Sequence, residues 1–107
     1  MAPTVARFCY WSNELRTKFN RAEYIRFRDA AIGEARRGNM YGMQCLFRFY
    51  SYGLEVRFDA SIFQDFQDMV LLDCIHGYTY GIEKLQAFLH YSGVNLEVLP
   101  DLKRYMM

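Results

Sequence analysis

Three side chains on predicted helices could together bind a flat, positively charged ring. Tyr52 and Tyr91 lie 39 residues apart, and Glu55 follows Tyr52 by about one helical turn. Aromatic faces attract a cationic ring by roughly 0.5 to 2 kcal/mol per contact, depending on desolvation. A carboxylate accepts hydrogen bonds from the N1–H and exocyclic amine of a guanine. Tyr52, Glu55 and Tyr91 are therefore a candidate clamp for a 7-methylguanine ring.

A basic residue lies on the same predicted helix surface. Arg48, Tyr52 and Glu55 follow one another at positions i, i+4 and i+7, opposite the apolar stripe of their helix. Arg48 could then contact a phosphate or a following base. In the alternative interpretation, both tyrosines pack on an adjoining helix and Glu55 pairs with Arg48. Spacing by itself leaves both interpretations open.

Other reactive residues do not form a recognisable catalytic or metal-binding motif. His76 and His90 are 14 residues apart and belong to no nucleophile or metal pattern. Cys9, Cys45 and Cys74 are too widely spaced for a CxxC pair, so they are interpreted as packing residues. No glycine-rich phosphate loop is present. We expect a binding protein rather than an enzyme, without a metal or cofactor.

An internal repeat predicts the scaffold for these residues. The chain matches itself at an offset of 39 residues, which is typical of HEAT or armadillo helical hairpins. Matching positions include Ser12/Ser51, Leu15/Leu54, Phe19/Phe58, Phe27/Phe66, Gly38/Gly77, Tyr41/Tyr80, Gly42/Gly81, Leu46/Leu85, Phe49/Phe88 and Tyr52/Tyr91. Such repeats bury their apolar faces only against neighbours. We therefore predict one all-α domain, 1–107, with HEAT-like repeats at about 5–38, 40–77 and 80–107.

Local signals predict the helix boundaries within these repeats. The predicted helices cover about 5–19 (core positions Phe8, Trp11, Leu15 and Phe19), 21–37, 40–57, 62–76 and 80–91. Asn20 and Glu23 form a capping-box pattern, and Gly38 and Gly77 are typical left-handed stops. Pro100 is suited to open a short last helix. The result is two full hairpins and a truncated third in a short solenoid.

The composition supports a folded chain whose charge is unevenly distributed. Its 107 residues are 52% hydrophobic and 18% aromatic, which excludes general disorder. No apolar run approaches the roughly 20 residues of a membrane span, and sparse cysteine favours a reduced, cytoplasmic location. Residues 1–57 carry ten basic against five acidic residues, and residues 58–107 three against seven. The basic half either attracts an anionic partner or has solvated helix faces.

The string MYGMQCLFRFYSYGLE at 40–55 resembles the C-terminal repeat domain of the La-related protein 1 family. The resemblance continues through 10–12, 19–20, 62–67, 80–84 and 87–92, so it covers almost the whole chain. It implies a fold of three HEAT-like repeats. It also implies binding of the 7-methylguanosine cap and adjoining 5′ nucleotides of mRNA. The family role is translational control of terminal-oligopyrimidine messages, in competition with the cap-binding initiation factor.

The resemblance also assigns roles to individual residues. Tyr52 and Tyr91 match the tyrosines that sandwich the methylated base, and Glu55 matches the carboxylate that reads its edge. Arg48 matches a basic residue serving the first nucleotide, and Arg16 matches another arginine of the same groove. The implied partner is a capped mRNA 5′ end, and no membrane is implied. We expect a monomer that forms part of a larger RNA-binding protein.

Two positions depart from the family pattern. Cys9 stands where the family usually has an arginine, and Asn13 stands where it has an aromatic residue. A stacked base is worth roughly 1–3 kcal/mol, so these changes predict a weaker preference for the first nucleotide. They also motivate an alternative function, a protein-interaction scaffold that keeps the helical repeats without cap binding.

Overall fold

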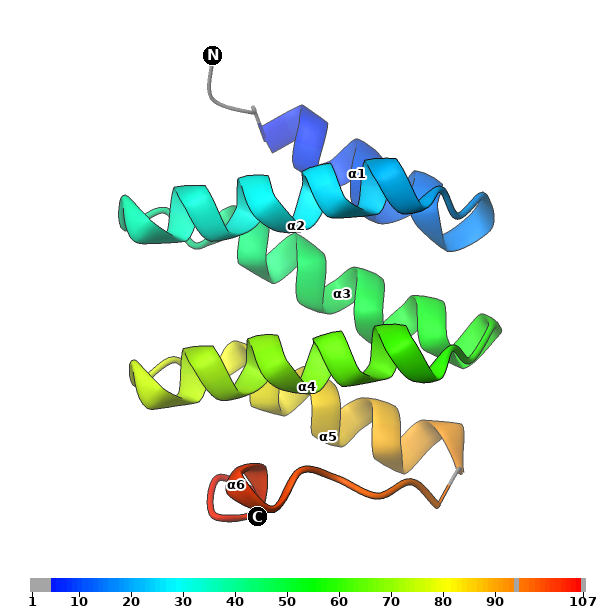
Figure 1. The fold of residues 1–107 in the computed structure, drawn as a ribbon, viewed down its shortest axis with the longest axis vertical. Coiled ribbons are helices and arrows are strands. Elements are labelled where there is room, and N and C mark those ends of the chain that lie inside the picture. The colour runs from blue at the N-terminus through cyan, green and yellow to red at the C-terminus, as the bar shows by residue number, and fades with distance from the viewer. Residues whose placement is uncertain (1–4, 94, 107) are drawn as a thin grey trace. The chain divides into compact units, whose positions relative to one another are not determined.

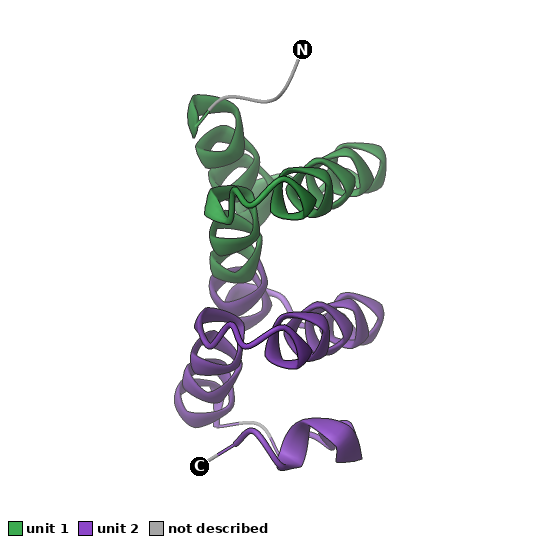
Figure 2. Cartoon of the chain, turned by 90° about the vertical axis from the view of Figure 1, so that its left-hand side faces the viewer, with its two compact units in different colours: residues 1–49 green, residues 50–107 purple. Residues whose placement is uncertain are grey.

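The computed structural model describes residues 5–93 and 95–106, and its regular structure there is entirely α-helical. The helices are α1 (Val5–Thr17), α2 (Arg21–Arg36), α3 (Tyr41–Val56), α4 (Ala60–Ile75), α5 (Tyr80–Ser92) and α6 (Pro100–Lys103) (Figure 1). The predicted all-α class is therefore confirmed. The chain divides into two compact units, residues 1–49 and 50–107, and the division falls within α3 (Figure 2).

The turn between α1 and α2 uses only half of the predicted capping box. Asn20 has an extended backbone, and its Oδ1 accepts a hydrogen bond from the Glu23 backbone N–H at 3.0 Å. The prediction required the Glu23 carboxylate to bond back to the cap residue, and it does not do so. Instead it accepts from Trp11 Nε1 at 2.8 Å and from Arg26 Nη1 at 2.6 Å. The buried indole N–H needs an acceptor, and Glu23 supplies it.

The turn between α3 and α4 repeats the same cap one period later. Asp59 has the same extended backbone as Asn20, and its Oδ1 accepts from the Ile62 backbone N–H at 3.0 Å. Because Asp59 is the N-cap, α4 begins at Ala60. The predicted start near Ile62 was therefore two residues late. A carboxylate also suits the positive end of the helix dipole.

Helices α2 and α4 end in identical glycine motifs. Gly38 and Gly77 have φ values of 88° and 87°, in the left-handed region that favours glycine. The Gly38 N–H donates to the Ala35 carbonyl and the Asn39 N–H to the Glu34 carbonyl. The second turn repeats both bonds between equivalent residues. These paired bonds satisfy the last carbonyls of each helix, as the glycine positions predicted.

Unit 1 is held together by interlocked aromatic rings. Trp11 stacks on Phe27 with ring centroids 5.6 Å apart, and Phe27 meets the edge of Phe49 at 6.1 Å. The ring of Phe8 fills the space beside Gly42, where an added Cβ would lie 2.7 Å from the Phe8 ring. A glycine at this position therefore allows the start of α3 to approach α1 closely.

Unit 2 repeats this core with equivalent rings. Tyr50 stacks on Phe66 at 5.0 Å, and Phe66 meets the edge of Phe88 at 6.4 Å. Each ring lies 39 residues after its counterpart in unit 1. Phe19, predicted as a core position, is 38% exposed, as is its equivalent Phe58 at 44%. Both follow the end of a helix, so the turn leaves one side of each ring in solvent.

The last helix completes unit 2. Helix α6 packs against α4, and Leu102 on α6 is fully buried. The backbone N–H of Leu99, just before α6, donates to Gln67 Oε1 at 2.7 Å. A buried amide on α4 thus fixes the approach to α6. Among the described residues, no helix is both long and apolar enough to cross a membrane.

Candidate nucleic-acid interface

Tyr52 lies in the last turns of α3 and contacts a lysine that the sequence analysis did not single out. Its ring is 38% exposed. Lys84 Nζ on α5 donates to the Tyr52 hydroxyl at 3.1 Å and lies 5.3 Å from the ring centroid. The same ammonium is 5.4 Å from the ring of Tyr80. The 39-residue period pairs Lys84 with Cys45, so periodicity gave no signal for a charge at this position.

The other two clamp residues are also on the surface of unit 2. Tyr91, at the end of α5, is 77% exposed and meets the His90 ring edge-on at 4.8 Å. Glu55 is exposed in the last turn of α3. A tyrosine that served only to pack on another helix would be buried, so that alternative does not fit Tyr91. All three candidate residues therefore present accessible side chains within one compact unit.

Arg48 is half-buried on the part of α3 that belongs to unit 1. Its Nη2 donates to Cys45 Sγ at 3.2 Å, and its guanidinium carbon lies 6.0 Å from the Tyr41 ring centroid. The side chain is therefore oriented by groups on its own helix. A guanidinium held in this way loses less conformational freedom when it binds a phosphate.

Arg16 is half-buried along α1. Its Nε donates to the Ser12 carbonyl oxygen and its Nη2 to Asn13 Oδ1, both at 2.8 Å. Asn13 is one of the two positions that depart from the family pattern. Asn13 therefore changes this surface in two ways. It lacks an aromatic ring, and it accepts a hydrogen bond from the neighbouring Arg16.

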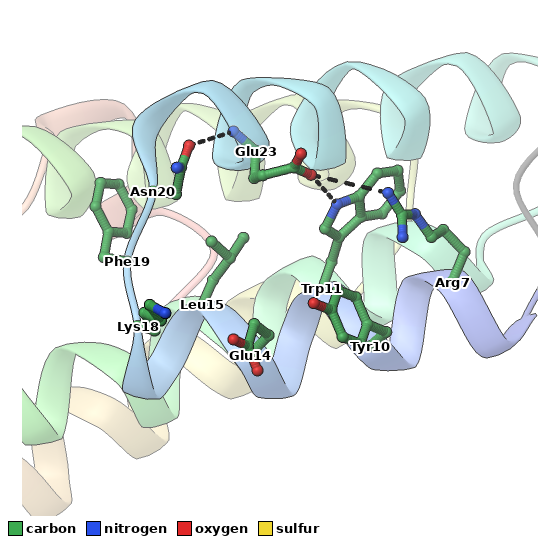
Figure 3. Close-up of a pocket in the computed structure, with 9 residues that line it drawn as sticks. All are labelled: Arg7, Tyr10, Trp11, Glu14, Leu15, Lys18, Phe19, Asn20 and Glu23. Carbon is green, nitrogen blue, oxygen red and sulfur yellow. Dashed lines mark hydrogen bonds and ion pairs between the residues drawn. The ribbon is translucent and has the colours of Figure 1, made fainter.

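A separate open pocket of about 300 Å³ lies in unit 1 at the turn between α1 and α2 (Figure 3). The predicted site residues do not line it. Arg7 lies over the Trp11 ring at 4.7 Å and pairs with Glu23 at 3.9 Å, as Figure 3 shows. The hydrogen bond from Trp11 lowers the Glu23 pKa, aided by Arg26 and Arg7. With its oxygens engaged by two hydrogen-bond donors and one further ion pair, Glu23 holds α1 on α2 rather than recognising a ligand.

Comparison with known families identifies the scaffold. Residues 3–107 match the family model described as the LARP1 HEAT repeat region. The chain belongs to this family. Comparison with curated proteins gives no match. The match spans nearly the whole chain, so it confirms both the helical-repeat fold and the resemblance noted in the sequence.

The two units of this LARP1-type HEAT repeat region have opposite charge. Residues 1–49 carry nine basic and four acidic residues, a net charge of +5. Residues 50–107 carry four basic and eight acidic residues, a net charge of −4. Arg16 and Arg48 lie in the basic unit, whereas the candidate clamp residues Tyr52, Glu55 and Tyr91 lie in the acidic one. An acidic environment suits a cationic base, and a basic environment suits phosphates.

Proposed function

We propose that this chain is an RNA-binding module that recognises the 7-methylguanosine cap and the adjoining 5′ nucleotides of mRNA. It acts in the cytoplasm in translational control of terminal-oligopyrimidine messages, as a monomeric, non-catalytic part of a larger protein. One observation supports this most strongly. A member of the LARP1 HEAT repeat family presents Tyr52, Glu55 and Tyr91 on the surface of a single unit.

In this proposal the base is recognised by stacking and by its polar edge. The rings of Tyr52 and Tyr91 flank the methylated guanine, and the Glu55 carboxylate accepts from its N1–H and amine. Lys84 lies against Tyr52 in the absence of ligand. A cationic base repels this ammonium, whereas the triphosphate bridge of the cap attracts it. Lys84 therefore leaves the tyrosine ring and pairs with the cap phosphates.

The nucleotides after the cap are served by the basic unit. Arg48 serves the first nucleotide, and Arg16 contributes positive charge to the same surface. Cys9 supplies no charge for a phosphate, and Asn13 supplies no ring for a base. We therefore propose cap recognition with only a weak preference for the identity of the first nucleotide.

Calorimetric titration with 7-methyl-GTP and with GTP tests the cap proposal. We expect the wild-type chain to prefer the methylated nucleotide, and Tyr91→Ala and Glu55→Ala each to abolish that preference. Tyr78→Ala is a matched control, because Tyr78 is another exposed tyrosine of unit 2 outside the proposed site. Equal weak binding of the two nucleotides by the wild-type chain would refute cap recognition.

A second titration separates phosphate binding from base recognition. Lys84→Met is expected to weaken both nucleotides by a similar factor and to keep their ratio. The dependence of affinity on salt should also become shallower, because one fewer phosphate contact is made. A change in the methyl preference itself would show that Lys84 acts on the base instead.

An exposed apolar surface favours the second candidate, a protein-interaction scaffold. At the end of α4, Leu72, Ile75 and Tyr78 are 41%, 63% and 44% exposed. Apolar surface of this kind is typical of sites that contact other proteins. Under this hypothesis Leu72→Ser and Ile75→Ser disrupt association with a partner in sedimentation experiments and leave nucleotide titrations unchanged.

A further inference from the structure

Two cysteines from different helices of unit 1 meet at one tyrosine hydroxyl. Cys9 Sγ on α1 lies 2.8 Å from the hydroxyl oxygen of Tyr41, at the start of α3. Cys45 lies one turn further along α3, so its side chain is on the same face of the helix as Tyr41, and Tyr41 and Cys9 are among the neighbours that act on its pKa. Tyr41 therefore lies between Cys9 on α1 and Cys45 on its own helix, beside the close approach of α1 and α3 at Gly42, and the three side chains form one cluster. The two cysteines are 36 residues apart in the sequence, so only the fold brings them together.

The groups around this cluster act on the pKa of Cys45 in opposite directions, and burial has the largest effect. Hydrogen bonds to Cys9 and Cys45, together with burial, raise the pKa of Tyr41 to about 12. The tyrosine thus keeps its proton near neutral pH and can donate it to a thiolate. Burial raises the pKa of Cys45, and the Tyr41 hydrogen bond and the charge of Arg48 act in the opposite direction. Arg48 Nη2 reaches Cys45 Sγ directly, at 3.2 Å.

We infer that Cys9 and Cys45 form a reversible dithiol–disulfide couple that a small disulfide, such as glutathione disulfide, oxidises. Cys9 is half-buried and Cys45 is fully buried, so Cys9 is the thiol that a small oxidant meets first. The two cysteines therefore have different roles, with Cys9 as the attacking thiol and Cys45 as the resolving thiol.

The chemistry consists of two exchange steps. The Cys9 thiolate attacks one sulfur of glutathione disulfide, which forms a mixed disulfide at Cys9 and releases one glutathione thiolate. The Cys45 thiol gives its proton to solvent, and its thiolate attacks the Cys9 sulfur and expels the second glutathione. Two protein thiols are oxidised to one disulfide, and one glutathione disulfide is reduced to two glutathione molecules. A reducing thiol reverses both steps.

Oxidation has a structural consequence for Arg48. In the reduced state Cys45 Sγ accepts from Arg48 Nη2 at 3.2 Å, and a disulfide holds that sulfur against Cys9 instead, so the bond from Arg48 is weakened. Bond formation also draws Cys45 towards α1. Because Arg48 is the proposed contact to the first nucleotide, the couple would adjust RNA binding. This consequence rests on the proposed function, whereas formation of the disulfide does not.

Peptide mapping tests the couple directly, because trypsin places the three cysteines on separate peptides. Cys9 lies on 8–16, Cys45 on 38–48 and Cys74 on 58–84. The folded chain is incubated with glutathione disulfide, alkylated, digested without reduction and analysed by mass spectrometry. We expect a linked 8–16/38–48 peptide that dithiothreitol separates. The linkage should form equally in Cys74→Ser, because Cys74 lies in unit 2.

Single variants distinguish the two roles. Cys45→Ser should stop at a stable glutathione adduct on 8–16, and Cys9→Ser should react at least tenfold more slowly at its remaining thiols. A persistent glutathione adduct on the wild-type chain, or a link involving 58–84, would overturn the couple. Titration of a capped oligonucleotide before and after oxidation then measures the effect on binding. If the disulfide forms and no methyl preference exists in either state, the proposed function fails and the couple stands.

Discussion

The two units have the same interior and different surfaces. In unit 1 the ring planes of the stacked pair Trp11–Phe27 are 21° from parallel. In unit 2 those of the equivalent pair Tyr50–Phe66 are 19° from parallel. Both units then continue to an edge-on phenylalanine. The surfaces have opposite net charge, and the clamp candidates lie in the acidic unit alone. The two units thus have equivalent residues where rings pack on one another, and different residues where a side chain contacts only solvent or a ligand.

One buried position also differs between the units. Glu34 near the end of α2 and Asp73 near the end of α4 are equivalent carboxylates, and both are buried. Glu34 accepts from Arg37 Nη1 at 2.7 Å. In unit 2 His76 takes the place of that arginine, and burial raises the Asp73 pKa to about 6, although His76 opposes the shift. The same scaffold position is therefore ion-paired in one unit and costly to ionise in the other.

The largest effect is expected from the shared aromatic core. Phe27→Ala and Phe66→Ala should each lower the free energy of unfolding by about 3–5 kcal/mol, because each removes a fully buried ring. Urea denaturation measures the loss, and native-state hydrogen exchange shows which helices lose protection. If only one of the two variants were strongly destabilised, the two cores would not be energetically equivalent.

The glycine stops should also respond alike. Gly38→Ala and Gly77→Ala should each cost about 1–2 kcal/mol, because both backbones are left-handed. An added Cβ meets nothing within 4 Å at either position, so the cost is that of the backbone alone. Gly33→Ala, inside α2, is the matched control and should instead stabilise by about 0.5–1 kcal/mol. Thermal unfolding of the three variants checks this order.

The two equivalent carboxylates, Glu34 and Asp73, should contribute differently to the pH dependence of stability. The raised pKa of Asp73 means that the unfolded chain releases a proton that the folded chain retains, between about pH 4 and pH 6. Asp73 therefore lowers stability as pH rises through this window. Asp73→Asn should raise stability by about 1 kcal/mol at pH 7, after allowance for solvent screening, and not at pH 4.

Glu34→Gln is the counterpart of that variant in unit 1. It removes the charge that accepts from Arg37, so we expect a loss of up to about 1 kcal/mol at pH 7. Chemical denaturation across pH measures both variants. Stabilisation by both, or by neither, would contradict the difference between the units.

The smallest effect concerns the exposed face of α1. Asn13→Ala removes the acceptor that engages Arg16, so more of the guanidinium becomes available to phosphates. We expect about twofold to fivefold tighter binding of a capped oligonucleotide at low salt. Asn95→Ala, which removes an exposed amide from unit 2, should have no effect. Fluorescence anisotropy with oligonucleotides beginning with C, A or G also tests the weak first-nucleotide preference.

Much of the fold followed from sequence patterns because the responsible forces are local. Asn20 and the two left-handed glycines act within a few residues of a helix end, and the structure confirms them. The 39-residue period repeats these local signals along the chain. The bond from Glu23 to Trp11 was not predicted, because it joins residues 12 positions apart across two helices. The same reason explains why the contact between Lys84 and Tyr52 was missed.

The sequence by itself therefore determined the helical repeats, the helix stops and the candidate clamp of Tyr52, Glu55 and Tyr91. Periodicity and turn chemistry depend on residue types and their spacing along the chain, so they can be recognised from the sequence. The tertiary structure decided which distant polar groups meet: Cys9 with Tyr41, and Lys84 with Tyr52. It also decided that Asp73 is buried without a counterpart of the Glu34–Arg37 ion pair. Burial and the distances between side chains exist only once the helices have packed.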